Sequence, residues 1–249
     1  ILEIVMRLRP NDAAAYDLAF KAAVATRDMA AARAAAEGLG KAQPGSALAS
    51  FYRGVVLEAE GRTGEAEAAY REALRINGLA VEPARALANL LVNTGRVPAA
   101  LAVYDDVAAA DPRAVDALLA KGELLLRQRR APEAEKTFRA ALQRAPASWL
   151  AYRGLAVSLG ARGDVAGAES VLAEGIGKVD QRQVLRADLA ELYVRSNRLD
   201  RALALYDDIV KEAPQLDVAK SRLAMLLATH RADAASLERA AALTAGFEK

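Results

Sequence analysis

The stretch Val115–Ser148, VDALLAKGELLLRQRRAPEAEKTFRAALQRAPAS, decides the fold of this chain. Its apolar residues recur at helical spacing in two segments, which predicts helices over Asp116–Gln128 and Pro132–Arg144. A tight turn over Arg129–Ala131 joins the two helices. The same template fits again when it is moved by 34 residues in either direction, so the stretch is one unit of an internal repeat.

The repeat covers the whole chain. Residues 1–12 read as the second helix of a truncated repeat, and residues 217–249 as a partial repeat whose segment after Leu227 predicts a longer loop between its helices. The sequence therefore predicts one continuous domain over residues 1–249. Complete repeats begin, without insertions, at Ala13, Ala47, Val81, Val115, Trp149 and Gln183.

Three positions of the repeat predict how its helices pack. The eighth is mostly small, the twentieth is always alanine and the twenty-fourth is mostly aromatic. Small side chains let two helices approach closely, and large ones fill the space between successive helix pairs. In the first repeat Phe20 takes the small position and Ala36 the large one, so we expect it to pack differently. The three sets are Gly54, Ala88, Gly122, Ala156 and Ala190; Ala32, Ala66, Ala100, Ala134, Ala168 and Ala202; and Tyr70, Tyr104, Phe138, Leu172 and Tyr206.

Turn residues recur at the same interval. Glycine and asparagine accept the left-handed conformation that ends a helix, whereas Arg129 in the same place costs about 1 kcal/mol of strain if its φ is positive. Proline closes the second helix because it cannot continue it. The turns fall at Gly61, Gly95, Arg129, Gly163 and Asn197, and the prolines at Pro44, Pro112, Pro146 and Pro214.

Composition excludes several classes of protein. The chain has 34 basic and 32 acidic residues, a balance that provides no footprint for nucleic acid or a membrane surface. It has no cysteine, which excludes disulfides and thiolate metal sites. No apolar run reaches the roughly 20 residues of a membrane span, so we predict no direct membrane insertion.

The 34-residue period, with small, alanine, aromatic and proline positions as above, resembles the tetratricopeptide repeat. The resemblance implies an all-α, right-handed superhelical solenoid of helix–turn–helix repeats. It also implies that the first helix of each repeat lines a concave face, through positions two, five, six, nine, twelve and thirteen. Because both ends of the chain cut a repeat, we expect end-to-end self-association.

Those positions define a candidate groove for a protein or peptide partner. Its N-terminal end is apolar and aromatic, and its middle is polar. Arginine and asparagine can bind a peptide backbone or a carboxylate. The candidate residues are Phe51, Tyr52, Val55, Arg85, Asn89, Asn93, Glu123, Arg127, Arg153 and Glu191.

A subgroup of the family clamps the carboxylate at the C-terminus of chaperones. Arg85 and Asn89 match the first pair of that clamp, but Ala120, Leu150 and Gly154 stand where it needs polar or basic residues. We therefore do not expect chaperone docking.

No catalytic, cofactor or metal site is predicted. The single histidine, His230, falls in the lengthened last loop without an evident triad. The pairs Asp105–Asp106 and Asp207–Asp208 point about 100° apart around a helix, so both members cannot readily chelate one ion. A solvated outer face is the better interpretation.

The leading hypothesis is a non-enzymatic scaffold that holds its partner in the concave groove. The alternative is a structural module of a bacterial cell-envelope assembly. The tail LAMLLATHRADAASLERAAALTAGFEK is similar to segments of long bacterial tetratricopeptide proteins of exopolysaccharide production and export. That similarity favours a periplasmic over a cytoplasmic location, although the sequence alone does not define the compartment.

Overall fold

The computed structural model describes residues 12–111, 115–231 and 233–245, and every regular element in these ranges is a helix. This confirms the prediction of an all-α fold. The chain forms two compact units, Ile1–Lys121 and Gly122–Lys249. The prediction of one continuous domain stays a prediction.

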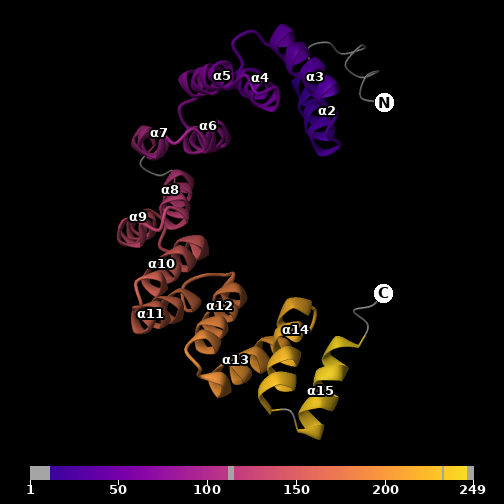
Figure 1. Ribbon diagram of the computed structural model, residues 1–249, viewed down its shortest axis with the longest axis vertical. Coiled ribbons are helices and arrows are strands. Elements are labelled where there is room, and N and C mark those ends of the chain that lie inside the picture. The colour runs from indigo at the N-terminus through magenta and orange to yellow at the C-terminus, as the bar shows by residue number, and fades with distance from the viewer. Residues whose placement is uncertain (1–11, 112–114, 232, 246–249) are drawn as a thin grey trace. The chain divides into compact units, whose positions relative to one another are not determined.

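Unit 1 holds three described helix pairs and the start of a fourth (Figure 1). In each pair two helices of one repeat pack together, and α3 also packs on α4, as α5 packs on α6. The truncated repeat predicted for residues 1–12 lies almost wholly outside the described residues. The helices are α2 (Ala13–Ala25), α3 (Met29–Ala42), α4 (Ala47–Ala59), α5 (Thr63–Ile76), α6 (Val81–Asn93), α7 (Val97–Ala110) and α8 (Asp116–Arg127).

Unit 2 continues the repeat with the same pairing (Figure 1). The last repeat departs from the expected longer loop, because its extra residues extend the first helix as a π-helical turn, η1 (Leu227–Arg231). That turn continues directly from α14. The helices are α9 (Ala131–Arg144), α10 (Trp149–Ala161), α11 (Val165–Ile176), α12 (Arg182–Arg195), α13 (Leu199–Glu212), α14 (Asp217–Leu226) and α15 (Ala234–Thr244).

The predicted packing positions are buried as expected. The alanines at the twentieth position are at most 1% exposed, and the large residues at the twenty-fourth at most 2%. In the second repeat the ring of Tyr70 lies so close to Gly54 that a Cβ on that glycine would be 2.4 Å from Cε1. Only glycine allows this approach.

The first repeat packs with its large and small residues exchanged. The ring of Tyr16 on α2 lies against Gly38 on α3, where an added Cβ would be 2.3 Å from Cε1. Phe20 stacks on Tyr52 of the next repeat, with ring centroids 3.7 Å apart and planes 8° from parallel. The aromatic ring here comes from the first helix and the glycine from the second, the reverse of the arrangement of Gly54 and Tyr70 in the second repeat.

The helix ends follow the predicted punctuation. The five predicted turn residues all have positive φ, from 57° at Asn197 to 82° at Gly163, and Arg129 has a φ of 58°. Helices α3, α9 and α13 each end two residues before a proline. Pro112 lies outside the described residues.

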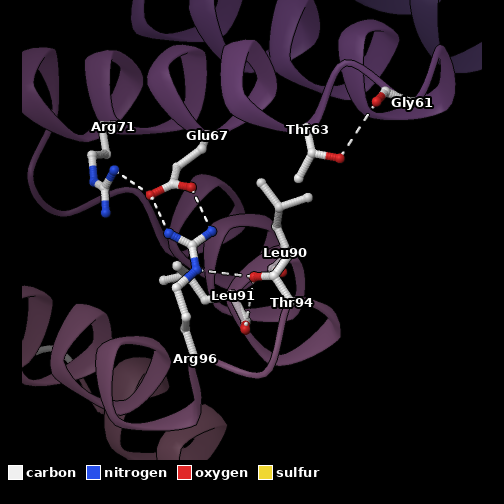
Figure 2. A network of polar contacts seen from close by, with 8 residues as sticks. All are labelled: Gly61, Thr63, Glu67, Arg71, Leu90, Leu91, Thr94 and Arg96. Carbon is white, nitrogen blue, oxygen red and sulfur yellow. Dashed lines mark hydrogen bonds and ion pairs between the residues drawn. The ribbon is translucent and has the colours of Figure 1, made fainter.

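Ion pairs join successive helix pairs inside each unit. Glu67 on α5 accepts hydrogen bonds of 2.6 and 3.1 Å from the guanidinium of Arg96, which precedes α7, and also pairs with Arg71 (Figure 2). The Nε of Arg96 also donates a hydrogen bond of 3.1 Å to the hydroxyl oxygen of Thr94. The hydrogen bonds from Arg96 hold the pKa of Glu67 below its ordinary value, although burial opposes them. In unit 2, Glu135 pairs with Arg139 and Arg162, and Glu169 with Arg198.

Candidate functional site

A hollow of about 960 Å³ opens in unit 1 between first helices. Residues of α2, α4 and the start of α6 line it, together with the α5–α6 connection and Asp116 at the start of α8. We call it the first-helix hollow. Its apolar wall consists of Val24, Leu48, Phe51, Val55 and Leu79, and its polar rim of Asp17, Lys21, Glu82 and Asp116.

The apolar wall is open to solvent. Val24, Leu48 and Leu79 are 38%, 37% and 48% exposed, and Phe51 and Val55 are half-buried. Gathered apolar side chains on a surface mark a site for a protein or ligand. The volume lies in the range of ligand-binding clefts, about 300–1,000 Å³. The structure thus places three of the predicted groove residues, Phe51, Tyr52 and Val55, in one hollow.

Tyr52 also lies at this hollow, but it is buried. Its side chain lines the hollow but is only 3% exposed. Its ring stacks on Phe20, and its hydroxyl donates a hydrogen bond to Asp17. Burial and the neighbouring Asp17 carboxylate raise the pKa of Tyr52, so the hydroxyl stays protonated. Its burial makes Tyr52 a packing residue more than a contact surface.

The rim is negative. Asp17 accepts a hydrogen bond of 2.8 Å from Lys21, and the bonds from Lys21 and Tyr52 hold the pKa of Asp17 below its ordinary value. The exposed carboxylates of Glu82 and Asp116 make no hydrogen bond or ion pair with any described residue. The rim thus holds three carboxylates and one ammonium group, that of Lys21, which already pairs with Asp17.

The polar groove residues of α6 lie outside this hollow. Arg85, Asn89 and Asn93 follow one another at intervals of four, so they share one helix face. Arg85 and Asn93 are exposed and Asn89 is half-buried. Within the described ranges none of the three side chains has a hydrogen-bond partner, so all three remain available to a ligand.

Unit 2 has a smaller hollow of about 320 Å³ between α10, α11 and α12. Arg153 lies on its edge, with Nε 3.1 Å from Oδ2 of Asp188. This Oδ2 is buried and the geometry makes no hydrogen bond to it. Burial raises the pKa of Asp188 more than Arg153 and Arg195 lower it. The exposed Val157 adds an apolar contact surface.

The remaining groove residues of unit 2 differ in whether other described side chains already bind them. Glu191 accepts a hydrogen bond of 2.7 Å from the hydroxyl of Tyr206 and pairs with Arg222 at 3.2 Å. It therefore holds its own unit together. Glu123 and Arg127 are exposed on α8, and the described residues provide neither with a partner.

A third hollow, of about 610 Å³, lies between α3, α4 and α5. Its floor consists of small or buried residues, among them Ala36 and Ala49, and none of its lining residues is a large exposed apolar one. Its charges largely satisfy one another, as Arg62 pairs with Glu65 at 2.6 Å and with Glu60 at 3.2 Å. This third hollow is therefore a weaker candidate for partner binding than the first-helix hollow.

The sequence contained signals for several residues that the predicted groove omitted. Asp17, Lys21 and Val24 occupy positions five, nine and twelve of the first repeat. Leu48, Glu82 and Asp116 occupy position two of the next three repeats. Reading the same positions through every repeat would have found these six. Leu79 lies in a connection between repeats, where the positional rule does not apply.

Among the described residues, no group of three or more His, Asp or Glu side chains could hold a metal ion. Asp105 pairs with Lys121, and Asp207 pairs with Lys211 at 2.8 Å. His230 is exposed in η1. None of the helices in the described ranges has the length and apolar character needed to cross a bilayer.

The fold is similar to several solved structures. A tetratricopeptide repeat protein of Thermus thermophilus, TTC0263, is 24% identical with a TM-score of 0.52, over 73% of this chain and 99% of that chain. PilF of Pseudomonas aeruginosa is 20% identical with a TM-score of 0.54, over 80% and 90%. A tetratricopeptide repeat protein of Parabacteroides merdae is 19% identical with a TM-score of 0.54, over 92% and 96%. At these identities the likeness concerns the fold alone.

The search of curated proteins finds no match. Two sequence families, both described as "Tetratricopeptide repeat", match residues 18–80, 85–148 and 119–183 in one case and residues 159–229 in the other. The matched residues cover most of the chain and follow the 34-residue repeat. Proteins with this repeat are generally protein-interaction scaffolds. The chain belongs to the tetratricopeptide repeat family.

Proposed function

We propose that this chain is a non-catalytic scaffold that binds a segment of a partner protein along its first helices. The single observation that carries the proposal is the first-helix hollow, where large apolar side chains stay exposed around a space of about 960 Å³. Fully burying one such side chain contributes about 1.5–3 kcal/mol. Leu48 and Leu79 are already half-covered, so each offers about 1 kcal/mol to a partner.

The first helices also carry polar groups that suit a polypeptide. Arg85, Asn89 and Asn93 on α6 and Arg127 on α8 have no partner within the described residues. Amide and guanidinium groups donate to backbone carbonyls, and arginine binds carboxylates with two parallel hydrogen bonds. Apolar anchors beside free hydrogen-bonding groups are the usual composition of a peptide-binding surface.

Site-specific photo-crosslinking tests the proposal. A photoreactive amino acid replaces Leu48 or Val55 in the first-helix hollow, and in a control it replaces Ala102, which is exposed on the second helix α7. We expect adducts with a partner protein in the source cells from the two hollow positions, and none from Ala102. Equal adducts from all three positions, or none from Leu48 and Val55, would contradict the proposal.

The second candidate function is a structural module of a bacterial cell-envelope or exopolysaccharide assembly. Its support is the resemblance noted in the sequence alone between the tail, residues 223–249, and long bacterial tetratricopeptide proteins of exopolysaccharide production and export. Reversing the charge of Arg85, Arg127 and Arg153 separates the two candidates. Loss of partner capture favours binding along the first helices. Retained capture, with loss only when exposed second-helix residues are changed, favours the structural module.

A further inference from the structure

We infer that the segment bound in the first-helix hollow is cationic, a short stretch that combines apolar side chains with lysine or arginine. The inference rests on the proposed function and adds the chemistry of the partner. The exposed apolar wall lies in the same hollow as two carboxylates, Glu82 and Asp116, with which no described residue pairs.

An acidic residue at position two is specific to the two repeats that contribute Glu82 and Asp116 to this hollow, and is not a general feature of the repeat. Glu82 and Asp116 occupy position two of consecutive repeats, in the first turns of α6 and α8, and both line the hollow. Position two is apolar in the other repeats from the second onward: Leu48, Leu150, Val184 and Val218. The acidic pair therefore replaces apolar residues at the place where the apolar wall of α2 and α4 ends.

Contacts among the described residues leave the charges of Glu82 and Asp116 uncompensated. Asp17, the third carboxylate of the rim, is held by Lys21 and Tyr52. Glu82 and Asp116 have no cation of the chain within ion-pair distance among the described residues. An acidic residue in a first turn does favour its helix, because it interacts with the positive end of the helix dipole. That role explains one acid in each helix, but not why both line one apolar hollow.

The negative charge of the rim favours a bound segment that carries positive charge. The whole chain carries a formal charge of +2, yet the rim of this hollow is negative. A lysine or arginine that follows an apolar anchor would meet Glu82 or Asp116 while the anchor lies on Leu48, Phe51 or Leu79. An acidic segment would meet repulsion there without compensation. The hollow of unit 2 differs, because two arginines, Arg153 and Arg195, flank its single carboxylate.

The expected size of the effect follows from exposed ion pairs. Each such pair changes an affinity by about 1.4- to 5-fold. Two pairs therefore change the affinity by about 2- to 30-fold in total. Added salt weakens the preference, because exposed charges are screened over about 8–10 Å at 0.1–0.15 M ionic strength.

Two synthetic peptides test the inference on the intact chain. They share the same apolar residues and carry either lysine or glutamate at the remaining positions, each with a fluorescein label. Fluorescence anisotropy at low and moderate salt measures their affinities. We expect the lysine peptide to bind more tightly, and its affinity to fall as salt is added.

A matched pair of variants links the effect to the hollow. The double variant Glu82→Gln and Asp116→Asn should weaken binding of the lysine peptide by about 2- to 30-fold. The control Glu37→Gln and Asp106→Asn makes the same chemical changes at exposed residues of the second helices α3 and α7, and should leave the affinity unchanged. Far-UV circular dichroism confirms that both variants remain folded.

Three results overturn the inference: no binding of the lysine peptide, equal or tighter binding of the glutamate peptide, or an unchanged affinity in the Glu82→Gln and Asp116→Asn variant. The proposed function fails separately. If photo-crosslinking at Leu48 captures a partner while the peptides show no charge preference, the scaffold function stands and only the cationic selectivity is wrong.

Discussion

The ring of Phe138 lies against Gly122 so closely that a Cβ on that glycine would be 2.6 Å from Cζ of the ring. The next first helix approaches the same ring, since a Cβ on Gly154 would lie 2.3 Å from Cε1. One aromatic side chain of α9 therefore packs against glycines of α8 and α10. Unit 2 is held together there by contacts that no larger residue allows.

Replacing Gly122 by alanine should destabilise the protein by about 1–3 kcal/mol, because the added methyl group overpacks the space that Phe138 fills. Replacing Ala134, which is fully buried, by leucine should have a similar effect. Gly160→Ala is the control, since nothing lies within 4 Å of its added Cβ and alanine favours a helix. Urea unfolding measures the difference, and equal stabilities of Gly122→Ala and the wild type would contradict this packing.

Replacing Arg129 by glycine should stabilise the protein by about 1 kcal/mol. Arg129 has a φ of 58°, in the left-handed region that disfavours a residue with a Cβ. Asn197 has nearly the same φ, 57°, but asparagine tolerates this region. Asn197→Gly should therefore raise the melting temperature less than Arg129→Gly does. The opposite order in differential scanning calorimetry would exclude backbone strain as the cause.

Glu67 should make part of the stability depend on acid pH. Arg96 holds the pKa of Glu67 below its ordinary value of 4.5. A carboxyl group whose pKa is lower in the folded state contributes stability above its unfolded pKa, and this contribution is lost as the pH falls through the folded pKa. Arg96 is half-exposed, so the contribution is about 1 kcal/mol.

The variant Glu67→Gln measures that contribution. It should be less stable than the wild type at pH 7, and the difference should shrink as the pH falls below 4.5. Glu65→Gln is a suitable control, because its ion pair with the half-exposed Arg62 lies at the surface, where solvent screens it. A difference that stays constant from pH 7 to pH 3 would show that Glu67 acts through packing and not through its charge.

Asp188 should have the opposite effect. Burial raises the pKa of its carboxyl group above the ordinary value of 3.8, so ionisation destabilises the folded state. That penalty is fully present above the folded pKa and disappears as the pH falls below 3.8. Asp188→Asn should therefore raise the melting temperature at pH 7, with a gain that fades on acidification. A lower melting temperature at pH 7 would mean that the ion pair with Arg153 outweighs the cost of burial.

The candidate site could be predicted only in part. The positional rule selected Phe51 and Val55, which line the hollow. The same rule includes position two, where Leu48 and Glu82 stand, and both of these also line the hollow. It could not predict that Tyr52 is buried, because that follows from its stacking on Phe20 of another repeat. It also could not predict that Glu191 is engaged by Tyr206 and Arg222, since both partners come from other helices.

The sequence by itself determined the helices, their order and their turns. These depend on local properties: helical spacing of apolar residues, alanine at every twentieth position, and glycine, asparagine or proline at the helix ends. Tertiary structure alone decided which side chains remain free. Leu48 stays exposed and Glu82 has no partner in the part of the chain that the structure describes, whereas Tyr52 and Glu191 are engaged, because exposure depends on neighbours that other helices supply. A repeating pattern specifies how each unit folds, but the surface left for a partner depends on how unlike side chains of successive units meet.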